Sequence, residues 1–550
     1  MATQRGPNAG RVFRTIALLM PGTMDEIVAL CRRRGFIFQS SEIYGGINGF
    51  WDYGPLGTEL KRNLKNAWWK DVVQGELSGP DGNPVDIVGL DCTIIMHPKA
   101  WVASGHVGGF ADLMSTCRHC KRLMRTDHLW DMIAETEWFK ALGELYAGGA
   151  VDSMQLKRWA DTKGKKLAPN LALVRNPQVT LSWLVERMAN GPLQMSLREF
   201  IMHLASEQVA ATGLQAPCPH CGGDLTEPKP FNLMFKTLVG AVEDPSNYAY
   251  LRPETAQGIF VNFQNVVDSS RVKVPFGIAQ IGKAFRNEVT PRNFTFRSRE
   301  FEQMEIEFFI RPDSANEWYA WWRNERFRWW QSVGLAGSNL RLREHDRDEL
   351  AHYAKAGAGV CDIEYKFPFT DPDFGELEGV AHRADFDLKQ HAEHSGKGEK
   401  ARYFDQERNE RYFPHVIEPS AGADRGTLAL LCEAYTPDES RASKVYMKFA
   451  PRMAPIKAGI FPLVNKDGMP EIGERLWRDL RRKWNVEFDE KQSIGKRYAR
   501  MDEAGTPFCF TIDSQTLQDG TLTVRHRDDQ RQERVAADRA AEWLAAQLEA

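Results

Sequence analysis

The sequence predicts an α+β protein with an antiparallel sheet flanked by helices, a helical insertion in the first half of the chain, and a separate C-terminal α/β domain. Three observations predict this arrangement. Residues 276–309 have the pattern of two long strands joined by an arginine-rich loop, two Cys-x-x-Cys pairs enclose residues 117–221, and strands alternate with helices after Pro451. The 550 residues suffice for about three or four domains of roughly 100–200 residues each.

The composition excludes several classes of protein. With 42% hydrophobic and 26% charged residues, the chain is neither disordered, nor collagen, nor a small disulfide scaffold. No apolar run approaches the roughly 20 residues that cross a bilayer. The 71 Lys+Arg against 74 Asp+Glu give a net charge of −3, so binding to a polyanion would depend on local patches of charge.

The N-terminal residues 1–23 are expected to form a leader that precedes the folded domains. They carry arginines but no acid, and Met24 is an alternative start; an organelle-targeting segment is the other interpretation. The nine cysteines are odd in number, and five are scattered singly. This pattern favours a reducing compartment, here the cytoplasm.

Helical periodicity predicts a capped helix over 25–34 and a second one over 58–73, separated by a glycine-rich stretch at 45–57. Residues 112–225 differ in character, since the cysteine pairs open and close them and they contain helical segments such as 152–164. We therefore expect them to form an insertion.

The second strand of the predicted hairpin, 301–309, is the first place where geometry indicates a site. Alternation places Met304, Ile306 and Phe308 on one face and leaves four residues on the other: Phe301, Gln303, Glu305 and Glu307. If the apolar face packs on the core, the two carboxylates line the space above the sheet. There they would bind a cation or ammonium group, or raise each other's pKa. The alternative is a solvated face of an antiparallel sheet.

The loop between the two strands carries four arginines: Arg286, Arg292, Arg297 and Arg299. They predict a polyphosphate clamp, because guanidinium groups match phosphate oxygens bidentately; a solvated loop is the alternative. The chain has no Gly-x-x-x-x-Gly-Lys-Ser/Thr loop and no convincing dinucleotide fingerprint. A nucleotide would therefore be held on the sheet by arginines.

A third element runs from a strand at 415–418 through a turn of small residues into a helix whose first turn carries Arg425. The helix start and the arginine favour anions, although an ordinary strand–helix junction would look alike. Tryptophans at 318–330 predict only a half-buried helix. After Pro451, strands at 457–464, 486–488 and 508–512 alternate with helices at 473–484 and 494–504, as in a small α/β domain.

The cysteine pairs Cys117/Cys120 and Cys218/Cys221 predict a structural zinc site. Turn residues around the second pair are typical of a zinc knuckle, and four thiolates can form one tetrahedral site that joins both ends of the insertion. The gap between the pairs is longer than in a usual zinc ribbon, so two unconnected turns are the alternative. His119 and His220 are possible substitutes as ligands.

Taken together, these segments resemble the class II aminoacyl-tRNA synthetases. Phe285-Arg-Asn-Glu288 with Arg297 and Phe301 resembles the second signature motif, Gly422-Ala-Asp-Arg425 the third, and the helix after Gly54-Pro55 the first. The segments 41–46, 49–57, 251–258 and 376–379 resemble the homodimeric glycyl-tRNA synthetases in particular, over about residues 24–550.

This resemblance implies a ligase with three parts: a class II catalytic domain (24–111 and 226–450), the zinc-bearing insertion (112–225) and an anticodon-binding domain (451–550). Glycine's carboxylate would attack the α-phosphorus of ATP to give glycyl-adenylate and pyrophosphate, and the 3′ end of tRNA(Gly) would then take the glycyl group. Open alternatives are a serine, proline or threonine enzyme of the same class, and a noncatalytic relative that binds nucleic acid.

By the same resemblance, Arg286 and Arg425 are the catalytic residues, and ATP enters with Mg²⁺, for which Glu376 is a candidate ligand. The implied ATP-binding residues are Arg286, Asn287, Glu288, Phe296, Arg297, Ser298, Arg299, Glu300, Phe301, Glu376, Leu377, Gly422 and Arg425. The implied glycine-binding residues are Arg125, Glu254, Phe301, Glu305, Glu418, Ser420 and Gly422. Acids beside the Cα would reject alanine by steric exclusion, so an editing domain is not needed.

The C-terminal domain is expected to meet tRNA phosphates with the basic residues of one helix: Arg475, Arg478, Arg481, Arg482 and Lys483. Arg497, Arg500 and Arg525 are expected to extend this patch, and a solvated helix with salt-bridge partners is the alternative. The domain as a whole is balanced in charge, so its binding to tRNA would depend on where the charges are located.

Overall fold

The computed structural model describes residues 23–126, 129, 137–147, 151, 153–164, 166, 218, 224–244, 247–347, 349–350, 353–370 and 373–549. The chain divides into two compact units, one of them Gly105–Met234 and the other made of the segments before and after it. Within the described ranges, no helix combines the length and apolar character that a membrane span requires.

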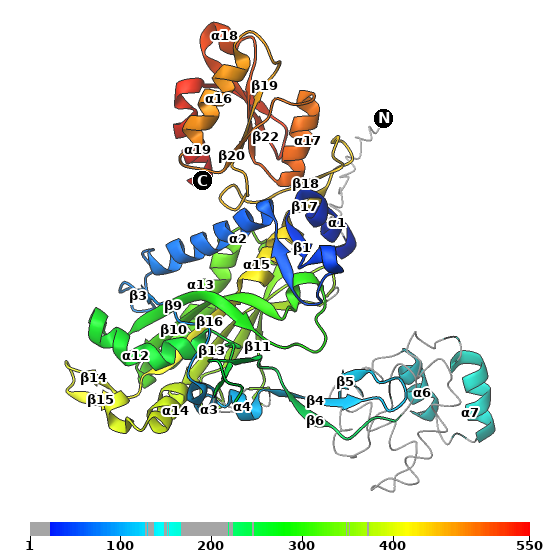
Figure 1. The fold of residues 1–550 in the computed structure, drawn as a ribbon, viewed down its shortest axis with the longest axis vertical. Coiled ribbons are helices and arrows are strands. Elements are labelled where there is room, and N and C mark those ends of the chain that lie inside the picture. The colour runs from blue at the N-terminus through cyan, green and yellow to red at the C-terminus, as the bar shows by residue number, and fades with distance from the viewer. Residues whose placement is uncertain are drawn as a thin grey trace, which may run out of the picture. The chain divides into compact units, whose positions relative to one another are not determined.

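A seven-stranded sheet forms the centre of the larger unit (Figure 1). Its strand order is β11-β12-β13-β16-β10-β9-β3, and only the β3–β9 pair is parallel. The strands are β3 (Ile87–Gly89), β9 (Phe276–Phe285), β10 (Glu300–Ile310), β11 (Leu340–Glu344), β12 (Val360–Tyr365), β13 (Gly375–Ala384) and β16 (His415–Gly422). The predicted antiparallel sheet and its long hairpin, β9–β10, are confirmed.

The predicted strand, turn and helix that begin at His415 differ from the structure in the turn. The strand β16 does not end at Glu418 but continues through the small residues to Gly422, and helix α15 (Ala423–Ala434) begins at the next residue. Ser420 pairs with Glu305 of β10 on one side and Gly379 of β13 on the other. Because ladders on both sides hold this segment extended, the small residues lie within a central strand, and the predicted turn is wrong.

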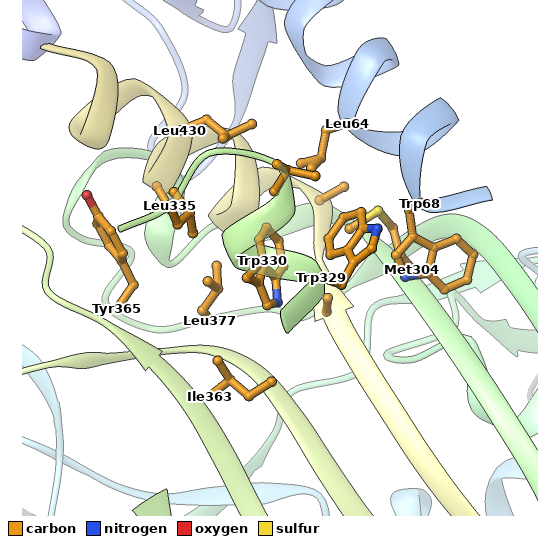
Figure 2. Packing of buried hydrophobic residues seen from close by; sticks show 14 of the residues in the cluster. Leu64, Trp68, Met304, Trp329, Trp330, Leu335, Ile363, Tyr365, Leu377 and Leu430 are labelled. Carbon is orange, nitrogen blue, oxygen red and sulfur yellow. The ribbon is translucent and has the colours of Figure 1, made fainter. Parts of the chain in front are cut away.

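The apolar face of the sheet packs against three helices, α2 (Pro55–Trp68), α13 (Ala315–Ser332) and α15. Met304 lies there, fully buried in one cluster with Trp68, Trp329 and Leu64 (Figure 2). The tryptophan-rich helix α13 is therefore more deeply buried than the half-buried helix that was predicted, since Trp322 and Trp330 are fully enclosed. Alternation along β10 correctly predicts which face enters this core.

The opposite face of β10 changes character along the strand. At the C-terminal end of the strand, Phe309 packs into a second apolar cluster beneath α12 (Ala256–Ser270), with Phe263 and Phe276. Helix α14 (Phe386–Ser395) contributes Leu388 to the same cluster. Toward the N-terminal end of the strand, the same face carries polar side chains that are buried and not solvated: Gln303, Glu305 and Glu307 are each less than 9% exposed. The alternative of a solvated face is therefore wrong.

The C-terminal residues form a mixed sheet of order β20-β19-β21-β22-β23 with helices around it. Its elements are β19 (Ala458–Pro462), α16 (Met469–Leu480), β20 (Val486–Phe488), α17 (Ile494–Ala504), β21 (Phe508–Ile512), α18 (Thr516–Asp519), β22 (Thr521–His526), β23 (Gln532–Ala536) and α19 (Ala540–Glu549). Three of the five predicted elements, β20, α17 and β21, have the predicted bounds. The helix α16 begins and ends four residues earlier than expected, because Pro470 fits the first helical turn and supports an early start.

Among its described residues, the smaller unit contains a three-stranded sheet of order β5-β4-β6 and three helices. Its elements are α4 (His106–Gly109), β4 (Ala111–Thr116), β5 (Leu123–Arg125), α6 (Glu137–Ala147), α7 (Ser153–Trp159) and β6 (Lys229–Asn232). Helix α7 and the turn of π-helix after it, Ala160–Gly164, lie where the helical segment 152–164 was predicted.

Short elements complete the larger unit: α1 (Met24–Arg34), β1 (Ile37–Gln39), β2 (Trp51–Tyr53), α3 (Pro98–Ala103), β7 (Lys236–Leu238), β8 (Tyr248–Tyr250), β14 (Tyr403–Asp405), β15 (Glu410–Tyr412), β17 (Tyr435–Pro437) and β18 (Val445–Met447). A capping box between Thr23 and Glu26 starts α1. Thr23 therefore belongs to the folded part of the chain, and the remaining leader residues, 1–22, lie outside the described residues.

Candidate active site

A cavity of about 350 Å³ lies above the polar face of the sheet, between β10, β13, β16 and the start of α15. Most of the residues that the sequence assigned to a site line it: Glu254, Arg286, Glu288, Phe296, Arg297, Ser298, Phe301, Glu305, Glu376, Leu377, Glu418, Ser420, Gly422 and Arg425. They come from segments up to 171 residues apart in sequence, and the sheet brings them together.

Other expected residues lie elsewhere. Arg299 donates hydrogen bonds to the backbone oxygens of Glu288 (2.9 Å) and Asn48 (3.0 Å), so it fixes the loop and does not line the cavity. Glu300 pairs with Lys283 (2.7 Å) beside a neighbouring pocket. Asn287 is also absent from the cavity lining.

Of the four arginines in the predicted clamp, Arg286 and Arg297 line the cavity, whereas Arg292 is exposed on the loop. The four arginines therefore do not line the cavity as a set; Arg425 of α15 lines it together with Arg286 and Arg297. Arg125 lies in β5 of the other unit, 3.2 Å from Asp112.

Two guanidinium groups dominate one end of the cavity. The Cζ of Arg425 lies 4.5 Å from the ring centre of Phe296, and its Nε donates to the Phe296 carbonyl (3.1 Å). Arg286 lies over Phe301 (5.4 Å), and its Nε donates to the Pro253 carbonyl (3.0 Å). Aromatic rings and carbonyl groups thus orient both groups in advance, an arrangement suited to phosphate oxygens.

Acids accompany the arginines at this end. Glu376 lies 3.0 Å from the Nη1 of Arg425, which holds the pKa of the Glu376 carboxyl below its usual value. Asp362 and His345, 2.8 Å apart, also line the cavity. Nothing in the sequence pattern indicated this last pair, because Asp362 lies on β12 and His345 directly after β11, with no motif around either residue.

Buried carboxylates dominate the other end. Glu305 is 1% exposed and accepts hydrogen bonds from the hydroxyl groups of Ser420 (2.7 Å) and Thr255. Burial, and next the charge of Glu254, raise the pKa of Glu305. Burial likewise raises the pKa of Glu418, although a guanidinium group lies beside it. This end attracts a compact cation.

That guanidinium belongs to Arg383, which sequence reasoning missed. Its Nη1 donates to both oxygens of Glu418 (3.1 and 2.9 Å), and its Nε and Nη2 donate to Asp387 (2.8 and 2.9 Å). The ring of Tyr353 covers it at 4.0 Å. The four-residue spacing of Arg383 and Asp387 could have indicated an ion pair. However, Arg383 lies at the end of β13 and Asp387 at the start of α14, so the pair does not stand out as an i, i+4 pair within one helix.

In the smaller unit, three cysteine sulfurs converge. The Sγ atoms of Cys117, Cys120 and Cys218 all lie within 4.8 Å of one another, and Cys120 and Cys218 are 3.6 Å apart as free thiols. Two thiolates on one tetrahedral zinc ion, with bonds of about 2.3 Å, would be about 3.8 Å apart. The donor set fits zinc. Cys221 and His220 lie outside the described residues, as do Asp127 and His128 next to Arg125.

The basic residues of the C-terminal domain divide into two groups. Those at α16 and just after it are exposed as predicted: Arg475, Arg478, Arg481, Arg482 and Lys483. Arg497 is 2% exposed and donates to the carbonyls of Pro462 and Asp489, and Arg525 is 6% exposed and pairs with Asp502 (2.8 Å). Both are structural, so the predicted extension through them is wrong.

Comparison with known proteins agrees with this geometry. Residues 241–435 match the family model described as the tRNA synthetase class II core domain (G, H, P, S and T), and residues 457–547 match the anticodon binding domain. A glycine–tRNA ligase from Rhodopirellula baltica is 48% identical, covering 96% of this chain and 100% of the relative. One from Thermobifida fusca is 44% identical, covering 96% and 98%.

A crystal structure of prolyl-tRNA synthetase from Cryptosporidium parvum has a similar fold, with a TM-score of 0.54 at 11% identity over 96% of this chain and 77% of that one. The full-length relatives share one name, which removes the serine, proline and threonine alternatives. The α+β fold is therefore that of a class II synthetase core with an anticodon-binding domain, and the chain belongs to the glycine–tRNA ligase family.

Proposed function

We propose that the cavity above the central sheet is where this chain joins glycine to ATP, giving glycyl-adenylate and pyrophosphate, before the glycyl group passes to the 3′ end of tRNA(Gly). One observation carries the proposal: the same cavity is lined by the guanidinium groups of Arg286, Arg297 and Arg425 and by the buried carboxylates of Glu305 and Glu418, which lie beside Arg383. Such a site complements a nucleotide triphosphate and a small ammonium compound at the same time.

At the arginine end, we assign Arg286 to the α-phosphate, where negative charge develops as the carboxylate attacks. Arg425 would lie at the γ-phosphate and cover one face of the adenine, and Phe301 would stack on the other face. Arg297, 3.7 Å from Glu288, would hold the triphosphate bent, and Glu288 would accept from the adenine amino group.

The oxygen ligands that Mg²⁺ prefers are present at the same end, since Glu376 lines the cavity and Arg425 favours its ionised form. Glu376 would hold Mg²⁺ through a phosphate oxygen or a water molecule, and the ion would offset the charge of the phosphates. Reactions of this kind depend on positioning and charge stabilisation more than on a protein base.

At the carboxylate end, we assign Glu254, Glu305 and Glu418 to the ammonium group of glycine, with Ser420 as a further hydrogen-bond partner. Ser420 holds Glu305 and Arg383 holds Glu418 by hydrogen bonds, so these two carboxylates cannot easily withdraw from a larger amino acid. Recognition of a substrate that has no side chain would then come from its charge and from steric exclusion.

Replacing Glu305 by alanine tests this assignment. We expect the KM for glycine in ATP–pyrophosphate exchange to rise about 10- to 100-fold, because a charge-assisted contact contributes about 1.5–3 kcal/mol. The KM for ATP should change little. Glu364→Ala is the matched control, since Glu364 is a buried acid of the same sheet that pairs with Arg341 and does not line the cavity. An unchanged KM for glycine in Glu305→Ala would reject the assignment.

We further propose that Cys117, Cys120, Cys218 and Cys221 bind a structural zinc ion. The convergence of three sulfurs from segments about 100 residues apart supports this. We expect the purified protein to contain about one zinc ion per chain by atomic emission, and Cys218→Ser to lose most of it. Cys92→Ser, which removes an isolated cysteine, should keep its zinc. A folded wild-type protein without zinc would contradict the proposal.

The remaining proposals concern organisation. We place the catalytic domain at 24–111 and 226–450, the insertion at 112–225 and the anticodon-binding domain at 451–550, and we assign tRNA phosphates to the exposed basic residues of α16. Arg125 stays a proposed glycine-binding residue. We also propose a cytoplasmic homodimer, as the resemblance implied.

A further inference from the structure

Glu307 is a buried acid that the assignments above do not use. It has no exposed surface, and neither of its carboxylate oxygens has a hydrogen-bond partner among the described residues. An ionised carboxylate so placed would be strongly unfavourable, because burial removes its hydration and nothing replaces it. Its protonation state therefore depends on its neighbours.

Glu307 lies on β10 directly behind the carboxylate end of the cavity. Oxygen atoms of Glu305, Glu307 and Glu418 all lie within 4.8 Å of one another. The residue paired with it on β9 is Ile278, which belongs to the apolar cluster under α12. Glu307 thus separates the ammonium pocket from apolar core, and it does not itself line the cavity.

Each element around Glu307 contributes to its electrostatic environment. Strand β16 gives Glu418, β13 gives Arg383, α14 gives Asp387, and β10 itself gives Glu305. The α12 side contributes Gln257, which donates to Asp387 (3.0 Å) and to Glu254 (2.9 Å). Among these named groups, five carboxyl groups face a single guanidinium.

We propose that Glu307 is a positioning residue that holds a proton while the ammonium pocket is empty and releases it when the ammonium group of glycine enters. The O–H bond of Glu307 breaks, the proton leaves by way of Glu418 and the cavity to water, and no other bond changes. The pocket thereby exchanges one positive charge for another. The inference depends on the proposed ammonium site.

The balance between Glu307 and Glu418 supports this location of the proton. Burial, and next the charge of Glu418, raise the pKa of Glu307 well above its usual range. Burial raises the pKa of Glu418 as well, to about 8, but two hydrogen bonds from Arg383 offset part of that rise, whereas the oxygens of Glu307 receive no hydrogen bond among the described residues. A cation in the pocket favours the ionised form of Glu307 too, so glycine lowers its pKa. Because the empty site binds more protons, glycine affinity should rise with pH.

Calorimetric titration of the full-length protein with glycine, in buffers of different ionisation enthalpy, measures the proton directly. We expect the wild type to release up to one proton, and glycine affinity to rise by up to about tenfold per pH unit. Glu307→Gln keeps the shape but cannot ionise, so both the release and the pH dependence should disappear. Glu364→Gln should keep both.

Two results would overturn the inference: a wild type that releases no proton between about pH 6 and pH 9, or a Glu307→Gln variant that still releases it. The first decides the matter even if Glu307→Gln does not fold. An unchanged KM for glycine in Glu305→Ala would instead reject the ammonium site itself, so the two failures are distinguishable.

Discussion

Replacing Arg286 by alanine is expected to slow glycine-dependent ATP–pyrophosphate exchange by roughly 10²- to 10³-fold. The guanidinium is held by the Pro253 carbonyl and the Phe301 ring before substrate arrives. Such a preorganised cation stabilises charge that develops only in the transition state, so its loss should appear mainly in kcat. The KM for glycine should change little, because the carboxylate end stays intact.

Arg292→Ala is the matched control for this prediction. The same residue type is removed from the same loop, but Arg292 is exposed and does not line the cavity. Exchange activity close to that of the wild type is expected. Equal losses in both variants would mean that the loop acts only through its overall charge.

Replacing Arg383 by leucine is expected to lower the free energy of unfolding by about 3–5 kcal/mol, since two buried acids, Glu418 and Asp387, lose their partner. Burial already raises the pKa of Glu418 while Arg383 is present, and removal of the cation should raise it further. The protonated form of Glu418 is then favoured in the folded protein, so the variant should lose stability as pH rises. Urea unfolding at several pH values measures both effects.

Arg328→Leu provides the comparison for Arg383→Leu. Arg328 pairs with Glu325 on the surface of α13, with a side chain 60% exposed, and exposed ion pairs contribute about 0–1 kcal/mol. If both variants lost the same small amount, Arg383 would not be compensating buried charge, and its role in holding Glu418 would need another explanation.

The sequence predicted those parts of the molecule in which local pattern and structure coincide. Period-2 alternation predicted both faces of β10, and it placed Glu305 on the face that borders the cavity. The bounds of helix α17 and strand β21 were also predicted correctly, because the local sequence pattern changes where each element begins and ends. Arginine motifs located Arg286 and Arg425.

Long-range pairing was not predictable from local pattern. The small residues after Glu418 resemble a turn, yet ladders on both sides keep them in a strand. Arg497 and Arg525 have the composition of a basic patch, but each meets acceptors inside its domain. Arg383 could not be recognised because Glu418, which it holds, lies 35 residues away in sequence.

The direct junction of β16 with α15 has a consequence for how the two substrates depend on each other. Glu418 and Ser420 belong to the strand and Arg425 to the first turn of the helix, with no loop between them. One rigid segment therefore sets the spacing between the proposed ammonium site and the proposed nucleotide site. Gly426 packs so closely on Trp330 and Leu64 that even a methyl group there would displace this segment. With the proposed assignments, a change in the packing of α15 should alter the affinities for glycine and ATP together.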